Sequence, residues 1–381
     1  MSCLQPGFER LMERIEIPLV DLKIQYRRIQ DQIDEAIQSV VGQASFIGGS
    51  VVRDFEREFA RLCGVDHCIG VGSGTDALCL SLWAAGVGEG DEVIVPANSF
   101  IATSAAVTTV RAQIKFVDID PNTYTLDVAA VKKAVTSQTK AIIPVHLYGQ
   151  PADMNAVLKI AQQHGLLVIE DAAQAHYAEY EGRPVGSLGA LGCFSFYPGK
   201  NLGAYGDAGA VVTHDQKYAE KIRMRANHGR KDKYNHAMEG INSRLDGLQA
   251  AVLRVKIRYI RRWNKWRSQA AALYTRLLAD VKEVETPTEK ENSRHVYHLY
   301  VVRARNRNNL QSHLKVRGVS TGIHYPVPLP ELEAYDYLGH KPEDFPVSSA
   351  YAGRVLSLPM FPEITDGQIL YVVDKIKQFY S

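Results

Sequence analysis

The sequence predicts an α/β fold, in which a largely parallel sheet is covered by helices on both faces and is followed by a smaller α+β domain. Short apolar runs alternate with longer amphipathic segments from about residue 66, and this alternation changes after residue 190. Strand-length runs separated by helices are typical of βαβ units. A chain of 381 residues also exceeds the usual size of one hydrophobic core. We therefore expect a large domain over residues 17–248 and a small C-terminal domain over 249–381.

The large domain is expected to consist of strands and helices that alternate along the chain. The apolar runs predict strands at 67–71, 92–96, 114–118, 141–145 and 166–169. The segments between them carry apolar residues at helical spacing and predict helices at 75–85, 99–109, 126–135 and 153–164. Residues 192–196 and 209–213 are expected to be adjacent strands that flank a loop rich in Gly, Pro and polar residues.

The remaining segments are more varied. Residues 228–246 are polar and are expected to form a surface excursion. A long helix with a basic exposed face is expected over 249–280 and connects the two domains. The small domain is then expected to contain a strand at 296–302, a helix at 308–317, a short strand at 320–324 and C-terminal helices.

Composition excludes several classes of protein. The chain has 44 Lys and Arg residues and 42 Asp and Glu residues, and a net charge of +2 does not predict a nucleic-acid-binding surface. The basic cluster at 254–267 follows helical spacing, which is more typical of a solvated or dimer-facing helix surface. The sequence contains no run of 18 apolar residues, so it predicts no membrane-spanning helix. Charged residues interrupt the first 21 positions, whereas a secretory signal has an uninterrupted apolar stretch. Five cysteines without C-x-x-C spacing predict neither disulfides nor a metal site. We expect a cytoplasmic protein without nucleic-acid or membrane partners.

The first candidate site segment is GSGTD at 72–76, between a strand and a helix. Glycines such as Gly74 let backbone approach closely, and the unpaired N–H groups of a helix start attract anions. The segment therefore fits a phosphate. The alternative is an ordinary tight turn in which Thr75 or Asp76 caps the helix.

The second segment is Glu170-Asp171, which ends an apolar strand and precedes AAQAH. Two carboxylates at the end of a buried strand are costly unless they meet protons or cations. One interpretation places Asp171 beneath a positively charged heterocycle, with Gln174 bonded to the same ring. The alternative makes Asp171 the cap of a following helix.

The third segment, SFYPGKNLG, places Lys200 in a loop 29 residues after Asp171. Most lysines are solvated surface charges. In combination, however, the three segments match pyridoxal phosphate. Its phosphate needs N–H donors, its protonated ring nitrogen needs an anion, and its aldehyde needs a lysine for a Schiff base.

These residues resemble those of the sugar aminotransferases of the DegT/DnrJ/EryC1/StrS family, within the aspartate-aminotransferase (fold type I) superfamily. The resemblance extends from residue 17 almost to the C-terminus. Its segments are IPLVDL at 17–22, GSGTDAL at 72–78, EVIVPANSFIATSAAV at 92–107, VHLYGQPADM at 145–154, VIEDAAQAH at 168–176, FSFYPGKNLGAYGDAGAVVT at 194–213, GINSRLDGLQAAVL at 240–253 and GIHYPVPLP at 322–330.

The resemblance implies a role for each site residue. Lys200 would form the Schiff base, Asp171 would keep the ring nitrogen protonated, and Gln174 would approach the ring oxygen. The amides of Thr75 and Asp76, with the Ser195 hydroxyl, would hold the phosphate. Phe100 would stack on the ring, although core packing is the alternative. Asn242 would reach the phosphate of a partner subunit, which implies a homodimer with shared sites.

The implied reaction is transamination, with the cofactor cycling between pyridoxal and pyridoxamine 5'-phosphate and Lys200 moving the proton. L-glutamate would donate the amino group and a nucleotide-linked keto sugar would accept it. The segment FYPGKNLGAYGDAGA resembles the branch that aminates C3 of dTDP-linked 3-keto-6-deoxyhexoses. The C4-aminating branch, the alternative, more often has other residues at Tyr197 and Asn201.

Three residues are candidates for the sugar side of the site. His324 and Tyr325 resemble residues that line it, although packing in a turn is the alternative. Tyr177 stands where the family usually has glycine, which would narrow the pocket. The sequence argues against two other roles. A dehydratase of this fold would have His in place of Lys200, and a pyridoxal phosphate-binding regulator would need an appended DNA-binding module.

Overall fold

The computed structural model describes residues 16–381 and confirms the predicted α/β architecture. A seven-stranded sheet has the order β1-β9-β8-β5-β4-β2-β3. Its strands are β1 (His67–Val71), β2 (Glu92–Pro96), β3 (Gln113–Val117), β4 (Thr139–Ile142), β5 (Leu167–Asp171), β8 (Leu191–Ser195) and β9 (Gly209–Thr213). β9 runs antiparallel to both neighbours, and the remaining pairs are parallel. The carboxyl ends of the other six strands therefore share one edge of the sheet.

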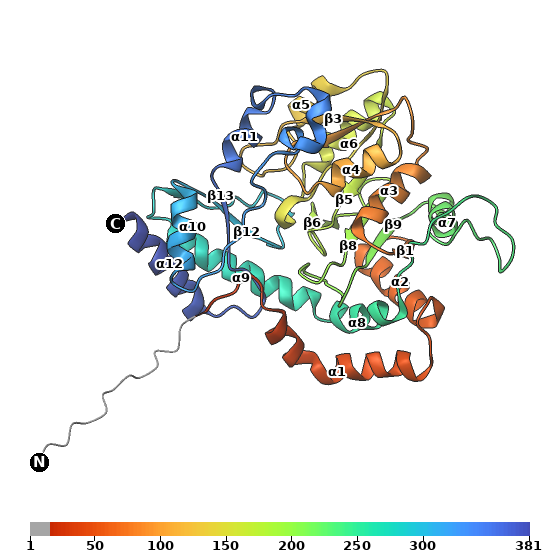
Figure 1. Cartoon of the computed structure of the whole chain (residues 1–381), viewed down its shortest axis with the longest axis horizontal. Coiled ribbons are helices and arrows are strands. Elements are labelled where there is room, and N and C mark those ends of the chain that lie inside the picture. The colour runs from red at the N-terminus through yellow and green to blue at the C-terminus, as the bar shows by residue number, and fades with distance from the viewer. Residues whose placement is uncertain (1–15) are drawn as a thin grey trace, which may run out of the picture.

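Helices cover both faces of this sheet and give three layers (Figure 1). One face packs against α3 (Gly74–Ala84), α4 (Ala102–Thr109) and α7 (Gln216–Arg225). The other face packs against α2 (Gly49–Cys63), α5 (Val128–Ala134), α6 (Met154–His164) and α8 (Gly247–Ile257). Strands buried on both faces need apolar residues throughout, which is why their sequences are continuous apolar runs.

A second, antiparallel sheet lies in the C-terminal part. It consists of β10 (Val284–Glu285), β12 (Tyr300–Ala304) and β13 (Val355–Leu358). Its apolar core is shared with α9 (Ile260–Leu278), α10 (Arg307–Lys315) and α12 (Asp366–Tyr380). Ile17 also enters this core, through a bridge to Val319. The division of the chain at residues 248 and 249 stays a prediction.

The shorter elements connect these two parts. They are β6 (Glu179–Tyr180), β7 (Arg183–Pro184), β11 (Ser293–Arg294), α11 (Pro346–Ala352) and the 3-10 turns η1 (Leu147–Gly149), η2 (Leu329–Glu331), η3 (Glu333–Leu338) and η4 (Pro342–Asp344). Within residues 16–381, no helix has both the length and the apolar character required to cross a membrane.

Two predicted elements were wrong. The single long helix over 249–280 is two helices, because the chain leaves α8 through a tight turn in which the N–H of Tyr259 bonds the Lys256 carbonyl at 2.9 Å. The Tyr259 ring then stacks on Trp263 at 5.4 Å. The expected strand at 320–324 is only a bridge between Gly322 and Ser357, because the chain turns away toward the edge of the large sheet after it.

Neither of the two helices that precede β1 was predicted from the sequence: α2 and a longer helix, α1 (Leu22–Gly42). The helix α1 lies against α8, below the sheet in Figure 1. Its buried residues Ile29 and Ile33 pack with Val252 and Trp263 of α8 and α9. Most of its surface is polar, so its apolar stripe is narrow and gives a weak sequence signal.

Candidate active site

The carboxyl ends of three strands bring the predicted site segments together. β1 leads into Gly72, β5 ends at Asp171, and β8 ends at Ser195. A Cβ atom added to Gly74 would lie only 2.6 Å from the Cβ of Ser195. The start of α3 and the end of β8 are therefore in direct contact, which requires glycine at this position.

The start of α3 has the features of an anion site. Ser73 caps the helix, since its Oγ accepts the N–H of Asp76 at 3.1 Å. The cap is thus neither Thr75 nor Asp76. The N–H of Thr75 has no partner among the described residues, and the nearby Ser195 Oγ accepts only the N–H of Tyr197, at 3.3 Å. The hydroxyl proton of Ser195 and the Thr75 amide remain available to an anion.

The carboxylate of Asp171 is buried but only partly satisfied. Thr103 donates its hydroxyl to Oδ2 at 2.8 Å, and the N–H of Ala173 donates to Oδ1 at 3.2 Å. Burial raises the pKa of Asp171, while the Thr103 bond and the Lys200 charge favour the ionised form. The residues directly after Asp171 form turns and not a helix, so the interpretation of this residue as a helix cap was wrong. It can pair with a cation.

Lys200 lies in the loop that follows β8. Its backbone N–H bonds the Tyr197 carbonyl at 2.8 Å, and its ammonium has no hydrogen bond or ion pair within residues 16–381. Burial lowers the pKa of Lys200 to about 8, against the opposing effect of the Asp171 charge. A buried amine with this pKa is partly neutral near pH 7 and is therefore nucleophilic.

Gln174 links two segments beside Asp171. Its Oε1 accepts the N–H of Tyr148 at 2.7 Å, and its Nε2 donates to the hydroxyl of Tyr325 at 3.2 Å. The hydroxyl of Tyr148 bonds the carbonyl of His324. These bonds bring Tyr325, from the C-terminal part of the chain, to the same edge of the sheet as Gln174.

Phe100 lies beside Tyr325, with ring centroids 6.1 Å apart. Its side chain is not core packing, because 55% of the residue is exposed. An exposed aromatic ring beside Tyr325, which itself bonds Gln174, offers a surface for stacking at this edge of the sheet. The His324 ring instead bonds Ser357 Oγ at 2.8 Å, and burial lowers the pKa of His324 to about 4.

Tyr177 and Asn242 lie outside these contacts. Tyr177 has φ 64°, a conformation that favours glycine. Two guanidinium groups lie near its ring centroid, that of Arg261 at 4.9 Å and that of Arg294 at 4.4 Å. Asn242 is exposed in the irregular segment after α7 and forms a bridge with Asn227.

Thr103 and Tyr148 were not predicted as site residues. Thr103 is 68 positions from Asp171, and Tyr148 is 176 positions from His324. No local pattern marks such contacts. The one signal that could have suggested them is that each lies in the segment following the carboxyl end of a strand, Thr103 after β2 and Tyr148 after β4.

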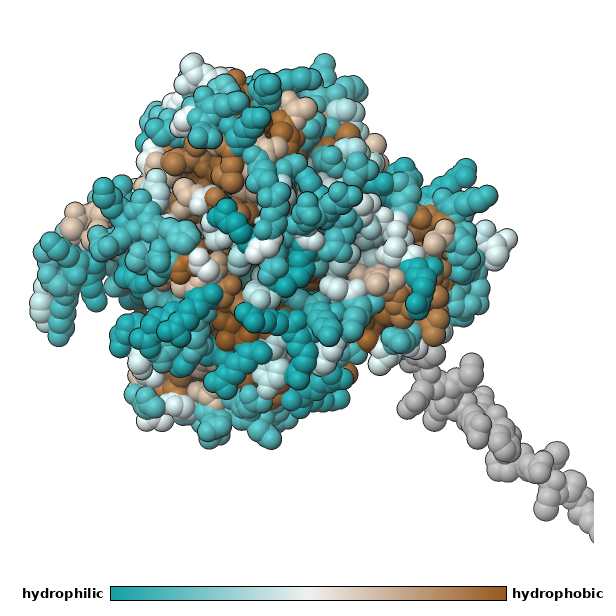
Figure 2. Space-filling view, turned by 180° about the vertical axis from the view of Figure 1, so that it is seen from behind, coloured by the Kyte–Doolittle hydropathy of each residue, from teal (hydrophilic) through white to brown (hydrophobic). Residues whose placement is uncertain are grey.

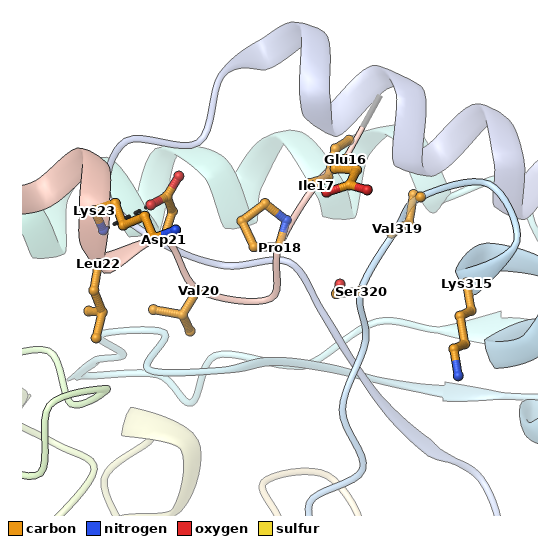
Figure 3. Close-up of a pocket in the computed structure, with 11 residues that line it drawn as sticks. Glu16, Ile17, Pro18, Val20, Asp21, Leu22, Lys23, Lys315, Val319 and Ser320 are labelled. Atoms are coloured by element: carbon orange, nitrogen blue, oxygen red, sulfur yellow. Dashed lines mark hydrogen bonds between the residues drawn. The ribbon is translucent and has the colours of Figure 1, made fainter. Parts of the chain in front are cut away.

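A cavity of about 670 Å³ lies elsewhere (Figure 3). It is lined by two segments, 16–23 and 315–320, and contains neither Lys200 nor Asp171. Its charged lining residues are Glu16, Asp21, Lys23 and Lys315. Within residues 16–381, no cluster of His, Cys, Asp and Glu could hold a metal ion.

The residues at the sheet edge fit pyridoxal phosphate. The close contact of Gly74 with Ser195 forms a cradle for a phosphate, Asp171 can pair with a ring N–H, and Lys200 is a free amine. The family model described as "DegT/DnrJ/EryC1/StrS aminotransferase family" matches residues 27–377. The chain belongs to this family. At the level of the family, this confirms the predicted activity class, an aminotransferase that uses pyridoxal phosphate.

Several proteins are similar to this chain over almost its whole length. The chain is 47% identical over 368 residues to the "Pleiotropic regulatory protein" of Geobacillus stearothermophilus, and the alignment covers 96% of this chain and 99% of the other. It is 44% identical over 369 residues to the "dTDP-3-amino-3,4,6-trideoxy-alpha-D-glucose transaminase" of Streptomyces venezuelae, covering 96% and 97%. The crystal structure of S. venezuelae DesV, described as a complex with a ketimine intermediate, has a TM-score of 0.94 at 44% identity, with 96% and 98% covered.

Proposed function

We propose that this aminotransferase uses pyridoxal phosphate to transfer an amino group from L-glutamate to C3 of a dTDP-linked 3-keto-6-deoxyhexose, in the cytoplasm. One observation carries the proposal: the buried carboxylate of Asp171 ends β5, directly beside β8, and the loop that follows β8 carries Lys200. The last residue of β8, Ser195, contacts the anion site at Gly74. The similarity to a transaminase of dTDP-3-amino sugars supports the sugar nucleotide and the position.

The residues that would hold the cofactor follow from the site. The Thr75 amide and the Ser195 hydroxyl would bind the phosphate, Asp171 would pair with the ring N–H, and the Phe100 ring would stack on one face. When bound, pyridoxal phosphate supplies an electron sink for a carbanion at the donor's Cα.

Lys200 would move the proton in this reaction. Its pKa of about 8 allows Nζ to accept a proton and to return it near neutral pH. Asp171 would remain ionised, because the Thr103 hydroxyl donates to it and a cationic ring would lie against it. Gln174 would keep Tyr325 in place at the sugar side through its bond to that hydroxyl.

We also propose a homodimer in which Asn242 completes the site of the partner. Asn242 is exposed beside Ile241, which is 41% exposed. The bridge of Ile47 to Asp246 brings the loop before α2 to the same surface, and Ile47 is 55% exposed. Apolar residues also reach the surface in patches on the face seen in Figure 2. A second copy would cover exposed apolar side chains of this kind.

Spectroscopy and product analysis test the proposed reaction. Adding L-glutamate to the purified protein with bound cofactor should convert its visible absorbance to that of the pyridoxamine form. A panel of dTDP- and UDP-linked keto sugars should then yield one 3-amino product, identified by NMR. A 4-amino product would contradict the proposed position, and an unchanged spectrum would contradict the proposed donor.

Mixing two inactive variants tests the shared site. If Asn242 acts across the interface, a mixture of Lys200→Ala and Asn242→Ala should regain activity, because a mixed dimer contains one site with both residues intact. Sedimentation of the wild type should show a dimer. A monomer with full activity, or a mixture without recovery, would overturn the shared site.

A further inference from the structure

The loop that carries Lys200 is anchored by its next residue. Asn201 is 2% exposed, and its amide is bonded on both sides. Its Nδ2 donates to Oδ1 of Asn264 at 2.9 Å and to the carbonyl of Val296 at 3.0 Å. Its Oδ1 is 3.3 Å from Nδ1 of His298. Burial of an amide is costly unless its groups are paired, so this arrangement fixes the loop strongly.

Asn264, on α9, joins this loop to a second segment. It is 5% exposed, and its Nδ2 donates to the carbonyl of His176 at 2.9 Å. His176 lies five residues after Asp171. One side chain therefore holds both the residue beside the reactive amine and the segment that follows the reactive carboxylate.

The orientation of both amides is determined by their neighbours. A backbone carbonyl accepts only, so the His176 carbonyl requires the NH₂ group of Asn264. This turns Oδ1 of Asn264 toward Asn201, whose own NH₂ group must face the Val296 carbonyl. Oδ1 of Asn201 then faces His298, which must carry its proton on Nδ1. The chain of bonds has one consistent direction.

The opposite side of the loop is held by a different helix. Lys256 of α8 donates to the Gly203 carbonyl at 2.8 Å, and Gln249 accepts the N–H of Tyr205 at 2.8 Å. These bonds act beyond Lys200 in the chain and make no contact with the segment after Asp171. Asn264 therefore differs from Lys256 and Gln249, because it bonds both the segment after Lys200 and the segment after Asp171.

We propose that Asn264 is a positioning residue that fixes the amine of Lys200 relative to the carboxylate of Asp171. A side chain that only filled the core would need no bond to both segments. Misplacement of reacting groups by about 1 Å reduces rates about 100-fold. Loss of the Asn264 amide should therefore lower kcat/KM by about this factor and change the environment of Lys200.

Chemical labelling of the cofactor-free protein tests this proposal. Lys200 in the wild type should become reactive toward acetic anhydride as the pH rises through about 8, measured by mass spectrometry of its peptide. In Asn264→Ala this midpoint should move up toward that of an ordinary lysine, because the loop relaxes toward water. Ser268→Ala is the control, since its hydroxyl bonds only the backbone carbonyl of Asn264. That variant should label like the wild type.

A purely structural role gives a different result. If Asn264→Ala lowers the melting temperature but labels like the wild type, the proposal is overturned. Should that variant not fold, Asn264→Leu removes the same bonds while filling most of the space of the amide. Combining either with Asn201→Ala should add little further shift, because both act through one chain of bonds, whereas additive shifts would contradict this. Only the kcat/KM result rests on the proposed function; the labelling needs neither cofactor nor substrate.

Discussion

The two carboxylates that end β5 lie in contrasting environments. Glu170 is completely buried and accepts four hydrogen bonds: one from Nε2 of His146 at 2.9 Å, and three at 2.7 Å from backbone N–H groups of the turn at 186–189. The N–H of Ala152 donates to Nδ1 of His146, so Nε2 carries the proton. Residues of the protein therefore supply all the hydrogen bonds that the Glu170 carboxylate requires, and it needs no ligand.

Asp171 faces the other side of the strand and has fewer partners. Only Thr103 and the N–H of Ala173 donate to it among the described residues, and Lys200 supplies the nearby positive charge. A fully satisfied buried carboxylate stabilises the fold, whereas a partly satisfied one keeps capacity for a ligand. Neighbours in sequence thus differ in role because a strand alternates its side chains.

Replacing Lys200 should have the largest effect on activity. Lys200→Ala removes both the nucleophile and the proton carrier, so transamination should fall by about 10⁴-fold. The conversion of the cofactor spectrum by L-glutamate measures this. Lys159→Ala, an exposed lysine on α6, is the control and should retain activity. If both variants lost the same activity, Lys200 would have no special role in the reaction.

The two carboxylates can be compared directly by isosteric substitution. Asp171→Asn should reduce kcat/KM by about 10³-fold with little loss of stability, because the counter-charge is lost. Glu170→Gln should instead lower the free energy of unfolding by about 3 kcal/mol, since it breaks a buried pair and leaves donors unsatisfied. Urea denaturation and steady-state kinetics measure both. The reverse pattern would exchange the roles of the two residues.

The anion site should respond to a single added methyl group. Gly74→Ala would place its Cβ 2.6 Å from Cβ of Ser195, so the phosphate cradle must widen. We expect affinity for pyridoxal phosphate to fall about 10-fold, equivalent to about 1.4 kcal/mol. Titration of the cofactor-free protein measures it. Gly353→Ala, with no atom within 4 Å of the added Cβ, is the control and should bind normally.

The smallest expected effect is a pH dependence of stability. Burial lowers the pKa of Lys200 from 10.5 to about 8, so between these values the unfolded chain binds more protons. The free energy of unfolding of the cofactor-free protein should therefore rise with pH from about 8 to 10.5. Lys200→Met should lack this contribution. Identical slopes for the two proteins would show that Lys200 is not desolvated.

Prediction from sequence worked where a pattern is local. The apolar runs at 67–71 and 92–96 coincide with β1 and β2, because both faces of these strands are covered. It did not find the break between α8 and α9, because helical periodicity continues through Arg258 and Tyr259. The two helices separate where one packs on the large sheet and the other joins the small one.

The sequence alone determined the α/β class, the positions of most strands of the large sheet to within a few residues, and the residue types that follow those strands. These follow from apolar runs and from short segments such as 72–76 and 170–171. Only the tertiary structure distinguished Asp171 from Glu170 and revealed the bond between Asn201 and Asn264. These features depend on partners tens of residues away. Burial sets how costly an unpaired group is, and burial is a property of the packed chain.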